Sequence, residues 1–214
     1  IMEPLEHDGQ EPPARIASLI KKHDVAFLLT SKSLSHTKAR LRASRAGTRI
    51  ASMPGITEFS FKSGGLTADY EEISMICKKL ESMLKDVRKI RIESSNGTRL
   101  LLEVGKYEWI TDEGLYHHPG DFGNLPAGEV ATCPCNAKGK LIIDRMGDKT
   151  NIEMLIESNF VKYVSDDELK EIFEKLPKAR NVAEIGIGAN PKARIIGNVL
   201  EDEKVLGTVH IGFG

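Results

Sequence analysis

The most constraining feature of this sequence is a change in its hydrophobic pattern close to residue 87. Before this point, short apolar runs alternate with stretches in which apolar residues recur every three or four positions, as in strands and amphipathic helices. After it, segments that alternate polar and apolar residues predominate, and Asn96-Gly97 is typical of a hairpin turn. The pattern predicts an α/β fold, with a Rossmann-like domain and parallel sheet over residues 1–87 and an antiparallel-rich α+β domain over residues 88–214.

The first domain is expected to contain three helices and two strands. Helices are predicted after Pro12, over residues 37–46 and over residues 69–85. Strands are predicted over residues 25–30 and 49–53. The run 25–30 is almost continuously apolar, which is typical of a strand buried on both faces of a parallel sheet.

The second domain is expected to consist mainly of short strands. One helix is predicted among them, with Ser165 and Glu168 forming a capping box at its start. Residues 120–130 are expected to form a long loop that leads into a strand. The predicted strands cover residues 89–94, 98–104, 130–132, 140–143, 160–164, 183–187 and 207–213.

Charge and composition argue against several functional classes. Thirty basic and 31 acidic residues give a net charge of −1, so no strong overall field favours nucleic acid or anionic membranes. A basic cluster in residues 32–45 is interpreted as a solvated helix face. No apolar run approaches the roughly 18–20 residues that span a bilayer, and no signal peptide is visible. We therefore expect a cytoplasmic protein without nucleic-acid or membrane partners.

Two short motifs are incomplete. Gly186-x-Gly188 follows a predicted strand but lacks the third glycine of a dinucleotide-binding loop, and Pro191 stands where the helix would begin. Cys133-Pro134-Cys135 has no second cysteine pair to complete a zinc site. Neither motif is interpreted as a binding site.

Three polar residues within otherwise apolar strands are the best candidates for chemistry: Glu129, Glu184 and His210. Burying an ionised carboxylate in an apolar strand destabilises the fold unless the carboxylate is paired with a cation or binds a metal. Oxygen and nitrogen ligands of this kind suit a divalent ion such as zinc, cobalt or manganese. The alternative is structural, with Glu184 in an ion pair with Lys192 or Arg194 and His210 in the core.

Around these residues the sequence resembles the aminopeptidase T family, the dinuclear-metal leucyl aminopeptidases of bacteria and archaea. Residues 124–130 (NLPAGEV) resemble its first signature, and residues 184–191 (EIGIGANP) resemble its second. Residues 197–204 followed by 207–211 resemble its third. Residues 33–37 and 51–56 are similar to archaeal members, so the resemblance extends over nearly the whole chain.

The resemblance implies a metallo-aminopeptidase, a protease and hydrolase that removes N-terminal residues such as leucine from peptides. Glu129, Glu184 and His210 match the family's metal ligands, with one glutamate bridging two zinc, cobalt or manganese ions and Glu184 in the catalytic role. It also implies a homodimer. The loop with His117, His118 and Asp121 is expected to line the substrate cleft.

The sequence departs from that family at its end. The family pattern continues with a catalytic tyrosine and a His-x-Asp ligand pair, which are absent here, so we expect a chain that is incomplete at its C-terminus and a partial site, empty or singly occupied. Two alternatives remain open. One is a mononuclear iron dioxygenase that cleaves a hydroxylated pyridine ring, and the other is a non-catalytic paralogue. Retention of both glutamates favours the peptidase, because a mononuclear iron site needs fewer carboxylates.

Overall fold

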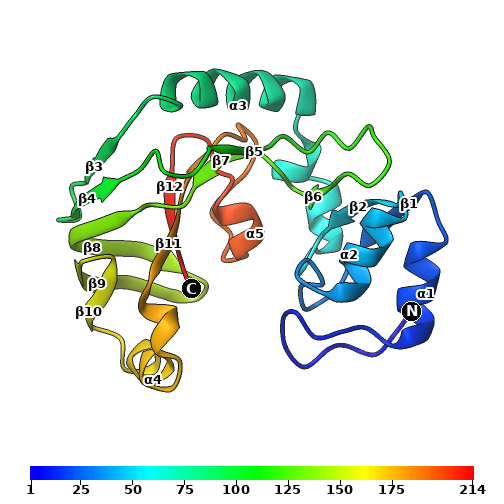
Figure 1. The fold of residues 1–214 in the computed structure, drawn as a ribbon, viewed down its shortest axis with the longest axis horizontal. Coiled ribbons are helices and arrows are strands. Elements are labelled where there is room, and N and C mark those ends of the chain that lie inside the picture. The colour runs from blue at the N-terminus through cyan, green and yellow to red at the C-terminus, as the bar shows by residue number, and fades with distance from the viewer.

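The computed structural model describes all 214 residues and has two lobes joined across the top by a long helix, α3 (Tyr70–Leu84) (Figure 1). The smaller lobe is built on a parallel sheet of order β1-β2-β6, with α1 and α2 packed together beside it. The predicted α/β fold with a parallel sheet is therefore confirmed. The elements of this lobe are α1 (Ala14–Lys21), β1 (Val25–Leu28), α2 (Lys38–Arg45), β2 (Arg49–Ser52) and β6 (Phe122–Asn124).

The expectation that residues 25–30 form a strand buried on both faces is wrong. Strand β1 is the edge of its sheet and pairs with β2 alone. Val25 and Phe27, on one face of the strand, are 41% and 61% exposed, whereas Leu28 on the other face belongs to a small core with Ile50. An apolar run occurs in both central and edge strands. The place of a strand in its sheet depends on which other segments of the chain pair with it, and the run itself carries no information about them.

The larger lobe contains two antiparallel sheets, as the alternating pattern predicts. The first, of order β10-β9-β8-β4-β3, comprises β3 (Lys89–Glu93), β4 (Arg99–Glu103), β8 (Asn136–Met146), β9 (Lys149–Glu157) and β10 (Phe160–Val164). The second, of order β12-β11-β7-β5, comprises β5 (Ile110–Asp112), β7 (Glu129–Thr132), β11 (Val182–Gly188) and β12 (Val209–Phe213). Gly97, with φ of +100°, forms the predicted turn between β3 and β4.

Short helices complete the larger lobe and its connections. The α-helices are α4 (Asp167–Lys175) and α5 (Val199–Asp202), and the 3-10 helices are η1 (Glu58–Phe61), η2 (Gly65–Thr67) and η3 (Pro177–Arg180). The N-cap of α4 is Asp166, whose carboxylate accepts a hydrogen bond from the Leu169 amide, and not the predicted Ser165. The Ser165 hydroxyl instead accepts a hydrogen bond from the Glu153 amide of β9, so strand pairing recruits the residue expected to cap the helix.

Two features lie across the predicted division at residues 87 and 88. Strand β6, in the stretch expected to be a loop, pairs with β2 of the smaller lobe. Helix α3 packs Ile73 and Cys77 into the 18-residue core of the larger lobe, together with Leu100 and Val130. The boundary at residue 87 stays a prediction. None of the helices combines the length and apolar character that a membrane crossing requires.

Candidate metal centre

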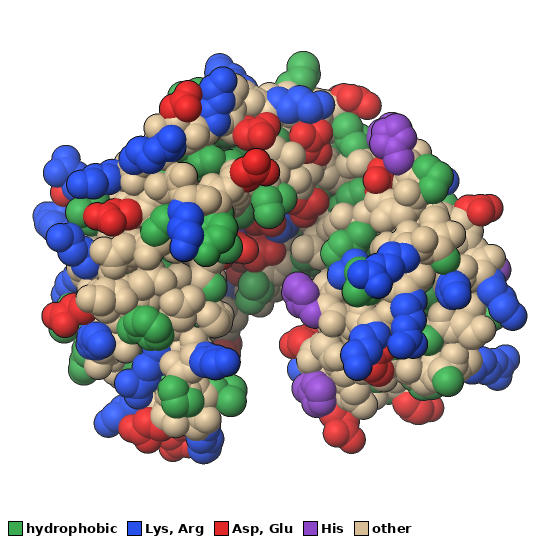
Figure 2. All heavy atoms as spheres, in the orientation of Figure 1, with side chains coloured by type: hydrophobic (Ala, Val, Ile, Leu, Met, Phe, Trp, Pro, Cys, Tyr) green, Lys and Arg blue, Asp and Glu red, His purple; other side chains and the backbone are tan.

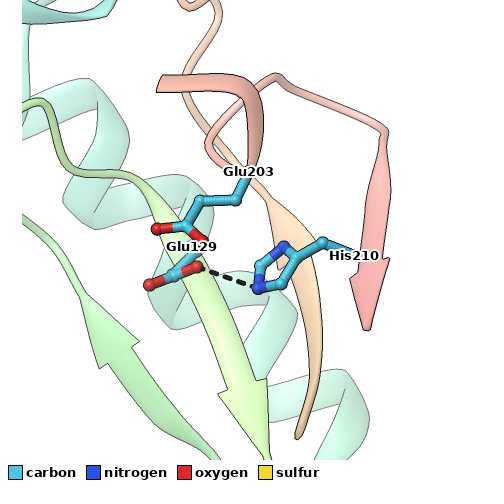
Figure 3. Close-up of side chains that lie close together, drawn as sticks. All are labelled: Glu129, Glu203 and His210. Atoms are coloured by element: carbon cyan, nitrogen blue, oxygen red, sulfur yellow. Dashed lines mark ion pairs between the residues drawn. The ribbon is translucent and has the colours of Figure 1, made fainter. Parts of the chain in front are cut away.

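Three side chains from separate elements of the larger lobe converge at one point (Figure 3). Glu129 is the first residue of β7, His210 lies in β12, and Glu203 directly follows α5. One ligand atom from each of these three residues lies within 4.8 Å of the others. Acidic side chains gather on the inner wall of the cleft between the two lobes (Figure 2), and α5 lies on that side of the larger lobe (Figure 1).

Strand β11 holds two of these residues in register, because it runs between β7 and β12. Gly188 pairs with Glu129, and Gly186 pairs with His210. A Cβ atom on Gly186 would overlap the imidazole of His210, and one on Gly188 would overlap the backbone oxygen of Val205. The Gly186-x-Gly188 motif therefore allows close packing around the centre.

The third residue is positioned by the anchoring of α5. The buried Glu201 carboxylate accepts hydrogen bonds from the backbone amides of Gly65, at 2.9 Å, and Arg194, at 3.3 Å. Asn198 caps the helix by accepting a hydrogen bond from the Leu200 amide at 3.1 Å. This short helix consequently presents Glu203 and the next residue, Lys204, toward the sheet.

Lys204 is fully buried within this acidic cluster. Its ammonium nitrogen lies 2.6 Å from Glu129 Oε1, 2.8 Å from Glu203 Oε1 and 3.9 Å from Asp112 Oδ2. Burial alone would lower the pKa of Lys204, but the negative charges of Glu129, Glu203 and Asp112 outweigh it and raise that pKa. Lys204 therefore remains charged and compensates the carboxylates around it.

Asp112 and His210 have pKa values that depart from their usual ranges. Burial raises the pKa of Asp112 to about 7, although Lys204 acts in the opposite direction. Burial would lower the pKa of His210, but the hydrogen bond that His210 donates to Glu184 and the charges of Glu129 and Glu203 raise it overall. His210 in turn lowers the pKa of Glu184 through the same hydrogen bond. The centre therefore concentrates negative charge around one imidazole.

The chemistry of the donor set fits a divalent metal ion. His210 Nε2 lies 3.3 Å from both Glu129 Oε2 and Glu184 Oε1. The buried Glu129 Oε2 and His210 Nδ1 atoms have no hydrogen-bond partner within the chain. Two carboxylates and an imidazole suit a first-row divalent ion, and a buried polar atom without a partner is a position that such an ion satisfies.

The structure thus brings together Glu129 and His210, and it places Glu184 next to His210 without including it in the tightest cluster. The alternative ion pair between Glu184 and Lys192 is not formed, because the Lys192 ammonium donates to the backbone oxygen of Thr67.

Sequence analysis missed Glu203, Lys204 and Asp112. Their signal was present but weak, since Glu203 and Lys204 end the third motif segment, 197–204.

The residues predicted to line a substrate cleft lie in the connection between β5 and β6. The Asp121 carboxylate accepts a hydrogen bond from the His118 amide at 2.8 Å, and His118 is exposed. His117 lines a cavity of about 600 Å³ together with Lys21 and Arg49, and this cavity includes none of the metal-cluster residues. A role of His117, His118 and Asp121 in substrate binding stays a prediction.

Comparisons with known proteins identify the relatives of this chain. The sequence profile of the family described as 2,5-dihydroxypyridine 5,6-dioxygenase (NicX) matches residues 6–214. The 2,5-dihydroxypyridine 5,6-dioxygenase of Pseudomonas putida KT2440 is 25% identical over 131 residues, covering 53% of this chain and 37% of that protein. The aligned segment therefore spans little more than a third of the length of this curated relative.

Two solved structures have a similar fold. The 2,5-dihydroxypyridine dioxygenase from Pseudomonas putida KT2440 superposes with a TM-score of 0.68 and 19% identity, covering 90% of this chain and 60% of that one. Wild-type AmpT from Thermus thermophilus superposes with a TM-score of 0.62 and 13% identity, covering 92% of this chain and 65% of that one. At these identities, each similarity concerns the fold alone.

The proposed membership of the aminopeptidase T family is therefore wrong, and so are the aminopeptidase, protease and hydrolase assignments that followed from it. The motif segments used for that assignment contribute to β6, β7, β11 and β12. Both families share this architecture, so these motifs report the fold around the centre and do not distinguish between the reactions.

Proposed function

Because this chain belongs to the 2,5-dihydroxypyridine 5,6-dioxygenase (NicX) family, whose profile matches residues 6–214, we propose that the protein cleaves a hydroxylated pyridine ring with dioxygen. We further propose that it does so at a single iron(II) ion bound by Glu129, Glu203 and His210. The observation that carries the proposal is the convergence of these three ligand atoms in a chain of this family.

The proposed reaction consumes dioxygen and a hydroxylated ring. As the name of the relative specifies, the bond between ring carbons 5 and 6 is cleaved, and a dioxygenase transfers both atoms of dioxygen to its product. When bound, iron(II) supplies the one-electron chemistry that lets dioxygen react with an aromatic ring. The contribution of the chain is to bind that ion, to orient its ligands and to balance their charge.

The charge balance of the cluster supports iron. Non-haem iron oxygenases commonly use two histidines and one carboxylate, whose net charge is −1. Here one imidazole and two carboxylates contribute −2, and the buried ammonium of Lys204, in contact with both Glu129 and Glu203, restores −1. The presence of two carboxylates is thus no argument against a mononuclear iron centre, because Lys204 neutralises one of them.

The proposal is tested with purified protein that is stripped of metal and reloaded with iron(II) without oxygen. On mixing with 2,5-dihydroxypyridine and air, we expect dioxygen uptake and loss of the ultraviolet absorbance of the ring. With ¹⁸O₂, both labelled atoms should appear in the product. His210→Ala should abolish uptake, whereas His7→Ala, at an exposed histidine remote in sequence, serves as the matched control.

Folded, iron-loaded protein that consumes no dioxygen with any hydroxylated pyridine would contradict the proposal and favour the non-catalytic alternative. Incorporation of a single labelled atom would contradict the dioxygenase reaction specifically. The homodimer expected from the sequence stays a prediction.

A further inference from the structure

The three parallel strands of the smaller lobe (Figure 1) begin at the same edge of their sheet, so the segments that precede them come together there. The Arg49 amide donates a hydrogen bond to the Asp24 oxygen at 2.9 Å, which joins the starts of β1 and β2. The Gly120 amide donates to the Gly47 oxygen at 3.0 Å, which attaches the loop before β6 to the end of α2. Between these segments lies a cavity of about 600 Å³, here called the strand-start pocket, which is lined by residues 21–24, residues 46–49, His117 and Pro119.

The strand-start pocket is positively charged. Lys21, Lys22 and Arg49 line it together with a single carboxylate, that of Asp24, so three cations and one anion leave a charge of +2. None of these four side chains takes part in an ion pair within the chain. Because a concave surface concentrates the field of the charges that line it, the pocket attracts anions although the whole chain has a net charge of −1.

Arg49 is held in place at this pocket. Its side chain is half-buried, and its Nη1 atom donates a hydrogen bond to the backbone oxygen of Tyr116 at 3.4 Å. The other N–H groups of the guanidinium have no partner within the chain, and the exposed imidazoles of His23 and His117 stand at the same cavity. A fixed guanidinium with free N–H groups, beside ammonium and imidazole groups, suits a ligand with several anionic oxygens.

A phosphoryl group matches these donors better than a carboxylate does. A carboxylate carries one charge and is satisfied by a single guanidinium, whereas a phosphoryl group carries a charge of about −1.5 to −2 and offers three acceptor oxygens. The donors of the pocket come from three directions: the end of α1, the start of β2 and the loop before β6. The cavity volume also lies within the range of roughly 300–1,000 Å³ that is typical of small-molecule sites.

We propose that the strand-start pocket binds the phosphoryl group of a phosphorylated small molecule, with Arg49 as the central contact and Lys21 and Lys22 as further cations. The pocket contains none of the residues of the metal cluster, so this site is separate from the metal centre and does not depend on the proposed function.

The test uses inorganic pyrophosphate as the probe, titrated into metal-free protein in a calorimeter at constant ionic strength. Wild-type protein should bind pyrophosphate more tightly than the dicarboxylate succinate. Arg49→Gln should weaken binding by about 10-fold or more, as expected for the loss of a hydrogen bond to a charged group. Lys22→Gln, at an exposed residue, should weaken it by about 2–5-fold. Arg99→Gln, at an exposed arginine of β4, is the matched control and should bind as wild type does.

The proposal is overturned if wild-type protein does not bind pyrophosphate, or binds succinate equally well. Equal affinities of Arg49→Gln and Arg99→Gln would also overturn it. Circular dichroism establishes folding, and Lys22→Gln takes the place of Arg49→Gln in this comparison if the latter does not fold. His210→Ala should bind pyrophosphate as wild type does, and a loss of binding there would place the anion at the metal centre instead. A single-stranded oligonucleotide that binds more tightly than pyrophosphate would contradict a small-molecule ligand.

Discussion

The imidazole of His210 lies against Gly186 on the neighbouring strand, so closely that a Cβ atom at residue 186 would overlap its Cε1 and Nε2 atoms. The same Nε2 atom faces Glu129 and Glu184 at 3.3 Å each. The orientation of the proposed histidine ligand is therefore set by a missing side chain on β11, and this dependence can be measured.

Gly186→Ala should displace His210 and weaken metal binding by about 10–100-fold, the range found when groups that orient ligands are changed. Crowding in a packed sheet should also lower the free energy of unfolding by about 1–3 kcal/mol. Titration of manganese(II) into metal-free protein measures the first effect, and urea denaturation measures the second. Gly214→Ala is the control, because an added Cβ there meets no atom within 4 Å. Equal affinities in both variants would refute the orienting role of Gly186.

The two glutamates that flank His210 should differ in importance. Glu129→Gln should weaken metal binding by more than about 100-fold, because it removes a ligand charge from the tight cluster. Glu184→Gln should weaken it by about 10-fold, because Glu184 orients His210 and lies outside that cluster. Dissociation constants for manganese(II) test this order. The reverse order would show that Glu184 is the ligand and that Glu129 serves mainly to pair with Lys204.

Replacing the buried ammonium of Lys204 should lower the free energy of unfolding of the metal-free protein. Lys204→Met leaves the carboxylates of Glu129 and Glu203 without their cation, and breaking a buried pair in this way costs about 3–5 kcal/mol of unfolding free energy. Lys192→Met is a suitable comparison, because the Lys192 ammonium only donates to the backbone oxygen of Thr67 and should cost less than about 1 kcal/mol. Urea denaturation at pH 7 gives both values. Similar losses in the two variants would mean that the cluster is well solvated.

The N-cap of α4 should add to stability in a pH-dependent manner. The hydrogen bond from Lys149, followed by that from the Leu169 amide, lowers the pKa of Asp166. A carboxyl whose pKa is lower in the folded state contributes stability above its unfolded value of about 3.9, and this contribution is lost as the pH falls through the folded pKa. Asp166→Asn retains a capping side chain but cannot ionise, so wild type should be more stable at pH 7, and this advantage should be smaller at pH 3.

Urea midpoints of wild type and Asp166→Asn at both pH values measure this difference. Lys149→Met removes the main partner of Asp166 and should reduce the same pH dependence. A stability difference that is unchanged between pH 7 and pH 3 would show that Asp166 acts through its cap geometry alone.

Much of the local structure followed from residue patterns. The helix over residues 69–85 was predicted to within one residue of α3 at each end, because a 3.6-residue apolar stripe is a local signal. The hairpin at Gly97 was equally local. Strand β6 was missed, because three residues beside glycines and a proline carry no strand pattern, and only pairing with β2 defines them.

The residue pattern alone indicated the α/β architecture and singled out Glu129, Glu184 and His210 as polar residues whose burial in apolar strands is unfavourable. It did not determine the reaction, because motifs that shape strands around a centre are shared by families with different chemistry. Only the tertiary structure placed Lys204 against Glu129, a residue 75 positions away in the chain. Periodicity and spacing describe neighbours along the chain, whereas the charge of a buried centre depends on which distant side chains the sheets and α5 bring together.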